Sequence, residues 1–166
     1  MEHLRFTEAT PELYPVVADI LTEATKIKNQ QNDHAWGTAG WSTQEVQGLA
    51  GHSTTYVVYS DEQAVATVSL QWEDEQSWGV QPQVAGYMHR LAIRQDMTGQ
   101  GLGEVIVNWA IKQTAAKGKE LLRLDCPADN EKLCAYYERL GFVRVGVTED
   151  TGHEGYVAAL YERAVR

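Results

Sequence analysis

Two apolar segments flank a glycine-rich turn and a run of helical periodicity between residues 86 and 126, and this order constrains the fold more than any other stretch of the chain. The first apolar segment ends at Ile93, and the second covers residues 121–126. Between them, apolar residues recur at the spacing of one buried helix face: Leu102, Val105, Ile106, Trp109 and Ala110. Gly118 is suited to end this helix. The segment therefore predicts a strand–loop–helix–strand unit with two parallel strands.

The loop between the first strand and the helix has the properties of a phosphate-binding turn. Its residues are Thr98, Gly99, Gln100, Gly101, Leu102 and Gly103. Glycines at alternate positions remove the β-carbons that would keep a phosphate away from the main chain, and they permit turns that direct successive N–H groups to one point. The helix start adds unpaired N–H groups and the positive end of the helix dipole. We therefore expect this loop to hold a pyrophosphate.

A dinucleotide site of the Rossmann type is an alternative for this unit. The Rossmann pattern is G-x-G-x-x-G, whereas this loop reads G-x-G-x-G and has Glu104 where the third spaced glycine belongs. Asp125, about 20 residues further on, favours the alternative. The position of the unit disfavours it, because a Rossmann domain usually begins with this unit and needs further repeats behind it, whereas here the unit starts past the middle of 166 residues.

A second motif follows the second strand. Residues 130–142 predict a short helix that Asp129 or Asn130 caps and Gly141 ends. The GNAT superfamily of acyl-CoA-dependent N-acetyltransferases typically has a strand of the type L-x-V and then a glycine-rich loop. The pattern N-x-x-A-x-x-x-Y-E-x-x-G-F follows further along the chain. Over about residues 85–145 the chain resembles that family in both motifs.

The resemblance implies acetyl-CoA as cosubstrate and assigns residues to it. The strand that receives the acetyl and pantetheine part through its backbone contains Leu91, Ala92 and Ile93, and residues 98–103 match the pyrophosphate loop. Asn130 matches the asparagine that contacts the pantetheine arm. Tyr137 matches the tyrosine that protonates the departing thiolate in many members.

Two residues depart from the family pattern. Thr98 stands where the family usually has Arg or Gln, which removes a long donor, although a threonine hydroxyl still donates to a phosphate oxygen. Leu133 replaces a small alanine, which changes packing and has little bearing on chemistry.

Tyr137 suits the role of general acid on chemical grounds as well. The unperturbed pKa of a phenol is about 10 and that of a thiol about 8.5, so a tyrosine holds its proton until the thiolate forms. The alternative is a half-buried core aromatic on a short helix.

His89 is the candidate for the base that the amine needs before attack. Strand alternation places Tyr87, His89, Leu91 and Ile93 on one face, so His89 and Tyr87 point towards the acceptor if the other two border the acetyl group. Histidine titrates near neutral pH and can accept a proton directly or through water. A histidine with a purely structural role on a half-buried strand is the alternative.

The acceptor side has no recognisable motif. Glu73, Asp74 and Glu75 form an acidic loop that, with Trp72 and Trp78, could attract a cationic amine, or it is simply a solvated loop. Trp36 and Trp41 lie in a connection between two helical segments and are either pocket residues or core anchors. We take Trp36, Trp72, Trp78 and Tyr87 as candidate substrate contacts.

Composition limits the class of protein. With 166 residues, 43% of them hydrophobic, the chain is expected to form a single domain over residues 1–166. A net charge of −9 disfavours nucleic acid as a partner, and neither a membrane span nor a basic-apolar leader is visible. Cys126 and Cys134 lack C-x-x-C spacing and suggest a reducing cytoplasm, and we expect no metal site. The family resemblance makes a homodimer plausible.

The remaining segments predict one α/β (α+β) sheet with flanking helices, and the resemblance to the GNAT family implies that this sheet is mixed and mostly antiparallel, with a splayed parallel pair. Helices are expected from Pro11 to about Lys28 and, behind a capping box that begins at Ser42, through Leu49. Strands are expected at residues 4–6, 56–59, 64–70, 142–147 and 156–161.

We therefore expect an acetyl-CoA-dependent N-acetyltransferase that acts on a small primary amine or, second, on a protein or peptide amine. A domain that binds acyl-CoA without turnover, and a nucleotide-binding oxidoreductase, are the alternatives from other classes.

Overall fold

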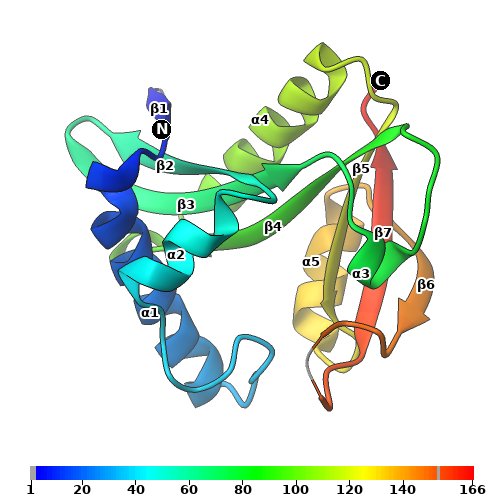
Figure 1. Ribbon diagram of the computed structural model, residues 1–166, viewed down its shortest axis with the longest axis horizontal. Helices are drawn as coiled ribbons and strands as arrows, with labels where there is room; N and C mark the ends of the chain where they lie inside the picture. The colour runs from blue at the N-terminus through cyan, green and yellow to red at the C-terminus, as the bar shows by residue number, and fades with distance from the viewer. Residues whose placement is uncertain (1–2, 153) are drawn as a thin grey trace. The chain divides into compact units, whose positions relative to one another are not determined.

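A computed structural model describes residues 3–152 and 154–166 (Figure 1). The described residues form a seven-stranded sheet in the order β1-β2-β3-β4-β5-β7-β6. The strands are β1 (Leu4–Glu8), β2 (Thr54–Ser60), β3 (Gln63–Gln71), β4 (Ala85–Ile93), β5 (Leu121–Pro127), β6 (Val143–Thr148) and β7 (Ala158–Ala164). The α-helices are α1 (Tyr14–Gln30), α2 (Thr43–Leu49), α3 (Glu75–Trp78), α4 (Leu102–Ala116) and α5 (Glu131–Arg139), with single 3-10 turns at Pro11–Leu13 and Gln95–Met97.

Two compact units divide the described chain. The first comprises residues up to Leu70 together with residues 90–106, and the second comprises residues 71–89 and 107–166. The expected mixed sheet is confirmed, since β4 and β5 pair in parallel, while β1–β2, β2–β3, β5–β7 and β6–β7 pair antiparallel. Among the described residues, no helix combines the length and the apolar character needed to cross a bilayer.

The core of the first unit lies where α1 and α2 pack against its strands. Its buried residues are Val17, Ala18, Ile20 and Leu21 of α1, Val46 of α2, Val57 of β2 and Ala92 of β4. The predicted capping box is confirmed, because the Ser42 hydroxyl accepts from the Glu45 N–H and the Glu45 carboxylate accepts from the Ser42 N–H. The box satisfies otherwise orphaned N–H groups at the start of α2.

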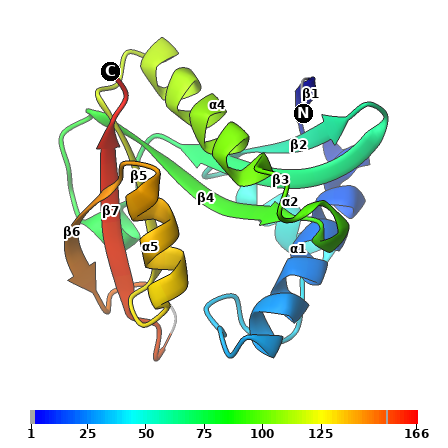
Figure 2. The ribbon, with the colours of Figure 1, turned by 180° about the vertical axis from the view of Figure 1, so that it is seen from behind.

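In the second unit, β7 pairs with both β5 and β6, and two helices cover opposite faces. Figures 1 and 2 show α3 on one face of β5 and β7 and α5 on the other. Tyr161 of β7 is fully buried and donates its hydroxyl proton to Glu138 of α5 at 2.7 Å, while Arg144 of β6 donates to the Tyr161 oxygen at 3.2 Å. These hydrogen bonds fix the rotation of α5 on the sheet.

The parallel pairing of β4 with β5 is short. It covers three residue pairs and ends at Tyr87 and Arg123, after which the strands part, as the splayed pair predicted from the family resemblance requires. Arg90 of β4 has φ of +52°, a left-handed backbone conformation that residues other than glycine seldom adopt. The regular alternation predicted for residues 87–93 is therefore interrupted at Arg90.

Other differences from the sequence prediction are local. The segment after β3 contains the single-turn helix α3, where the sequence predicts only an acidic loop. The first helix begins as the 3-10 turn at Pro11–Leu13 before α1. Pro15 stands in the first turn of α1, where its missing N–H costs nothing.

The core of the first unit gives a stability prediction. Ile20 is fully buried and Asp19 beside it is exposed. Ile20→Ala should lower the free energy of unfolding by about 2–5 kcal/mol, because it removes buried methyl groups and leaves a cavity. Asp19→Ala should change it by less than about 0.5 kcal/mol. Urea unfolding measures both, and equal effects would contradict the assigned packing.

Candidate active site

Side chains on the two faces of β5 contact different helices: α3 on one face and α5 on the other. Arg123 stacks over the ring of Trp78 in α3, with its guanidinium carbon 4.7 Å from the ring centroid. Cys126, on the alternate face, lies with its Sγ 3.7 Å from Sγ of Cys134 in α5. Strand alternation therefore assigns Asp125 to the α3 face and Cys126 to the α5 face.

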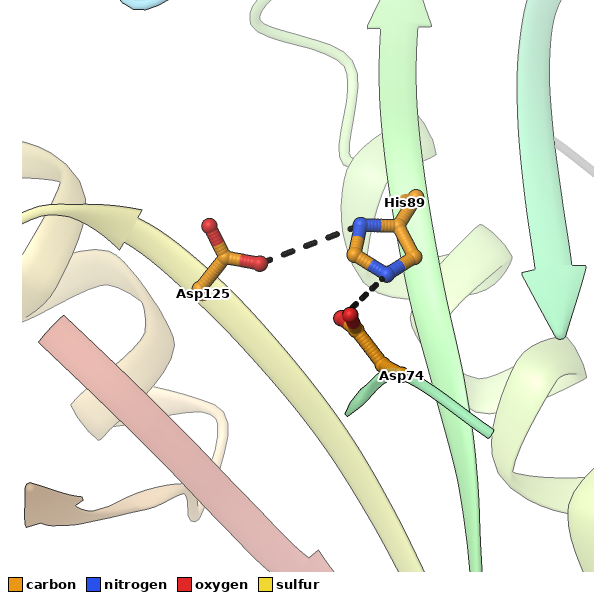
Figure 3. Close-up of side chains that lie close together, drawn as sticks. All are labelled: Asp74, His89 and Asp125. Atoms are coloured by element: carbon orange, nitrogen blue, oxygen red, sulfur yellow. Dashed lines mark ion pairs between the residues drawn. The ribbon is translucent and has the colours of Figure 1, made fainter. Parts of the chain in front are cut away.

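His89 lies at the parted end of β4 with a carboxylate at each ring nitrogen (Figure 3). Its Nε2 is 2.9 Å from Oδ2 of Asp74, and its Nδ1 is 3.8 Å from Oδ1 of Asp125. The side chains are 18%, 6% and 11% exposed for His89, Asp74 and Asp125. The structure thus brings His89, the predicted base, together with Asp74 and Asp125, neither of which was predicted from the sequence as a partner of His89.

Neighbouring groups hold both carboxylates in place. Asp74 is the N-cap of α3, and its Oδ1 accepts from the Ser77 N–H at 3.3 Å, which leaves Oδ2 for His89. The Tyr156 hydroxyl donates to Oδ2 of Asp125 at 2.8 Å, which leaves Oδ1 for the other side of the ring. The imidazole therefore has a fixed partner on one side and a wider approach on the other.

Among the described residues, one group of side chains could hold a metal ion by the spacing of its ligand atoms, which lie within 4.8 Å of one another. Its members are Asp74, His89 and Asp125. The carboxylates face different nitrogens of the ring, however, and one metal ion can take only one ring nitrogen of a histidine. The geometry therefore favours proton exchange over a shared cation, and the absence of a metal site stays a prediction.

Tyr137 lies in α5 on the other face of β5. It is 8% exposed, its ring packs edge-on against Tyr136 and Phe142, and its hydroxyl makes no hydrogen bond to another described residue. Burial raises the pKa of this hydroxyl well above its usual range, and Cys126, Tyr136 and Asp125 add to the rise. Tyr137 is therefore a phenol that stays protonated at neutral pH, as a general acid requires.

The glycine loop lies in the first unit and is open to solvent. Residues 98–101 are exposed, α4 begins at Leu102, and Gly99 and Gly101 have φ of +78° and +77°. No heavy atom lies within 4 Å of a β-carbon built on either glycine, so nothing in the protein fills the space beside this backbone. Ala92 of the neighbouring strand is buried in the core, whereas Leu91 and Ile93 are half-buried.

The other predicted residues have structural contacts in the part of the chain described. Asn130 caps α5 by accepting from the Leu133 N–H at 3.1 Å. Tyr87 is 2% exposed, and its hydroxyl accepts from Arg123 at 2.9 Å. The remaining candidates are tryptophans held by ring contacts: Trp36 under Lys28, Trp72 under Lys117, and Trp78 under Arg123 and edge-on to Tyr87.

Comparison with known proteins decides the family. Residues 17–142 match the model of the acetyltransferase (GNAT) family. The chain belongs to the GNAT family. The uncharacterized N-acetyltransferase YesJ of Bacillus subtilis (strain 168) is 27% identical over 145 residues, which cover 82% of this chain and 80% of YesJ. The resemblance drawn from the two sequence motifs is thereby confirmed, and the protein is an acyltransferase enzyme.

Solved structures share the GNAT fold. Aminoglycoside acetyltransferase AAC(6')-Ib in complex with coenzyme A has a TM-score of 0.77 and 14% identity, covering 98% of this chain and 95% of that chain. RimL, a ribosomal alpha-N-protein acetyltransferase in complex with coenzyme A, has a TM-score of 0.72 and 18% identity, covering 99% and 95%. At these identities the likeness shows the fold alone, and the two enzymes are named for different kinds of acceptor.

The buried phenol gives a pH prediction. Because the folded state raises the pKa of Tyr137, the stability that the neutral phenol contributes is present below the unfolded pKa of about 10 and is lost as pH rises above it. In that range this group should lower the free energy of unfolding by about 1.4 kcal/mol per pH unit, and Tyr137→Phe should lose less stability with pH than wild type. Urea unfolding from neutral pH to pH above 10 measures the difference; parallel curves would contradict the assignment.

Proposed function

We propose that the protein transfers the acetyl group of acetyl-CoA to a primary amine of a small molecule by direct attack in a ternary complex. The observation that carries the proposal is His89, held between two carboxylates where β4 and β5 part, with the buried phenol of Tyr137 on the opposite face of β5. The amine nitrogen forms a bond to the thioester carbon, and the carbon–sulfur bond breaks. The amine loses one proton, and the leaving thiolate gains one.

The two residues have complementary roles in this reaction. His89 accepts the proton of the amine, since an imidazole is the side chain that exchanges protons near neutral pH. Tyr137 gives its proton to the thiolate, and its raised pKa keeps that proton available until sulfur becomes basic. A thioester is already activated, so a covalent enzyme intermediate is not needed.

The cosubstrate contacts follow from the family and from the glycine loop. We assign the pyrophosphate to residues 98–103, where open space faces the backbone at Gly99 and Gly101. The backbone of residues 91–93 would receive the acetyl and pantetheine part, and Asn130 would contact the pantetheine arm while it caps α5.

A small cationic amine suits the acceptor side better than an anion does. The chain carries a net charge of −9, and Asp74 and Asp125 flank His89. AAC(6')-Ib is named for an aminoglycoside and RimL for a ribosomal protein, so amines of both kinds belong in the test. We keep the cytoplasm as the compartment and the homodimer as expectations of this proposal.

Coenzyme A release tests the function directly. With acetyl-CoA and a panel of alkylamines, polyamines, aminoglycosides and N-terminal peptides, wild type should release free thiol in step with acetylated amine. If coenzyme A stabilises the protein against heat but no amine releases thiol, the protein binds acyl-CoA without turnover and the proposal is wrong. Stabilisation by NAD(P) alone would favour the oxidoreductase alternative.

Tyr137→Phe tests the general acid. Loss of the proton donor should lower kcat by about 100-fold or more while KM for acetyl-CoA changes little, because the phenol acts on the leaving group and not on binding. Tyr136→Phe removes a hydroxyl from the neighbouring position of α5 and should keep kcat within about twofold of wild type. An unchanged kcat for Tyr137→Phe would remove this residue from the mechanism.

Gly101→Ala tests the pyrophosphate loop. Gly101 has φ of +77°, and a β-carbon there strains the backbone by about 1–2 kcal/mol, so affinity for coenzyme A should fall about tenfold. Gly37 is also exposed, also has φ of +77° and also has no atom within 4 Å of a built β-carbon. Gly37→Ala is therefore the matched control for strain alone, and titration calorimetry should show wild-type affinity for it. Equal losses in both variants would contradict the assignment.

A further inference from the structure

We propose that Asp74 is a positioning residue that keeps the proton of neutral His89 on Nε2, so that Nδ1, facing Asp125, accepts the proton of an acceptor that arrives as an ammonium ion. The inference rests on the proposed acetyl transfer and names its substrate class: alkylamines that are protonated at neutral pH.

The contact between Asp74 and His89 determines the tautomer. Oδ2 of Asp74 lies 2.9 Å from Nε2, and a carboxylate presents only lone pairs at this distance. Both atoms are buried, and neither has a hydrogen-bond partner of regular geometry in the described chain, so the 2.9 Å contact between them is the polar contact that each makes. A lone pair on Nε2 would face a lone pair of Oδ2 without water between them, which is unfavourable. Neutral His89 therefore carries its hydrogen on Nε2.

The other ring nitrogen is then a hydrogen-bond acceptor. Nδ1 lies 3.8 Å from Oδ1 of Asp125, which is too far for a direct hydrogen bond. The second oxygen of Asp125 already accepts from Tyr156. A lone pair on Nδ1 and a carboxylate oxygen thus face the same space, and both need a donor.

An ammonium group satisfies both acceptors. It has several N–H donors and a positive charge, whereas His89 lies between two carboxylates and brings no compensating charge in its neutral form. One N–H can donate to Oδ1 of Asp125 while another donates to Nδ1 of His89. A neutral arylamine gains less from the two carboxylates, so the site should discriminate against it.

The proton transfer balances within these groups. The ammonium gives one proton to Nδ1 of His89, and the freed nitrogen lone pair attacks the thioester carbon. His89 becomes a cation whose charge Asp74 and Asp125 stabilise. As the carbon–sulfur bond breaks, the nitrogen loses a second proton to solvent, and Tyr137, which gives its proton to the thiolate, regains one from solvent. His89 then returns its proton to solvent, so one proton is released overall and the enzyme recovers its starting state.

Asp74→Asn separates positioning from folding. Asn is as good an N-cap as Asp, so its carbonyl oxygen can keep the hydrogen bond from Ser77. Its NH₂ group would then face Nε2 and donate, which moves the ring hydrogen to Nδ1 and removes the proton acceptor. Glu73 precedes Asp74 and is exposed, so Glu73→Gln removes the same charge without touching His89.

Nitrogen-15 NMR of the imidazole reads the tautomer, with His89→Gln used to assign the signals. Neutral wild type and Glu73→Gln should show hydrogen on Nε2, and Asp74→Asn should show it on Nδ1. In steady-state kinetics, Asp74→Asn should lower kcat by about 100-fold or more and change KM for acetyl-CoA less than twofold, while Glu73→Gln should match wild type. Asp125→Asn should mainly raise KM for alkylamines, by about tenfold.

A wild-type spectrum with hydrogen on Nδ1 would overturn the proposal, and it requires no variant to fold. Unchanged kcat in Asp74→Asn with a reversed tautomer would also overturn it, as would arylamines used as well as alkylamines. If wild type transfers acetyl to no amine, the proposed function fails, while the spectrum still decides whether Asp74 sets the tautomer of His89.

Discussion

The parallel pairing of β4 with β5 stops at Tyr87 and Arg123, and the arrangement of the second unit depends on this stop. At the paired end the packing is tight, because a β-carbon on Gly86 would lie 2.8 Å from atoms of both Thr114 and Trp72. Two residues beyond the last pair, His89 and Asp125 meet through side chains and not through a backbone ladder. Because the backbone pairing ends before His89 and Asp125, their polar side chains can lie close together between the two strands.

Beyond the end of this pairing, the two faces of β5 carry different groups. Asp125 points to the α3 face and completes the surroundings of His89, while Cys126 points to the α5 face near Cys134 and Tyr137. Burying carboxylates beside an imidazole is costly unless hydrogen bonds compensate, and the α3 cap and Tyr156 provide them. This arrangement suits the proposed reaction, in which the amine loses a proton on one face of β5 and sulfur gains a different proton on the other.

Much of the fold could be predicted from the sequence, because it depends on local signals. The spacing of apolar residues indicated α4, the box at Ser42 indicated α2, and the glycine loop with the motif at residues 130–142 indicated the family. The partners of His89 could not be predicted in this way. Asp74 is placed beside His89 by the one-turn helix α3, whose sequence resembles that of an acidic loop. Asp125 is placed there by the register of β4 with β5, and no local sequence pattern encodes that register.

Strand alternation also failed where the backbone departs from regular geometry. The positive φ of Arg90 interrupts β4, so a pattern of period two cannot be carried from Tyr87 to Ile93. The aromatic residues illustrate a second limit, because composition cannot distinguish a pocket from a core. Tyr87 and Trp78 pack around Arg123, which in turn pairs with Glu162 at 3.0 Å.

The central claim is that acetyl transfer takes place where β4 and β5 part. A crystal structure with a bisubstrate analogue, in which an alkylamine nitrogen is joined through an acetyl bridge to the sulfur of coenzyme A, tests it most directly. The account predicts that this nitrogen lies within hydrogen-bond distance of Nδ1 of His89 and Oδ1 of Asp125, with the sulfur next to the Tyr137 hydroxyl. An analogue bound with its nitrogen away from His89, or its sulfur away from Tyr137, would contradict the account.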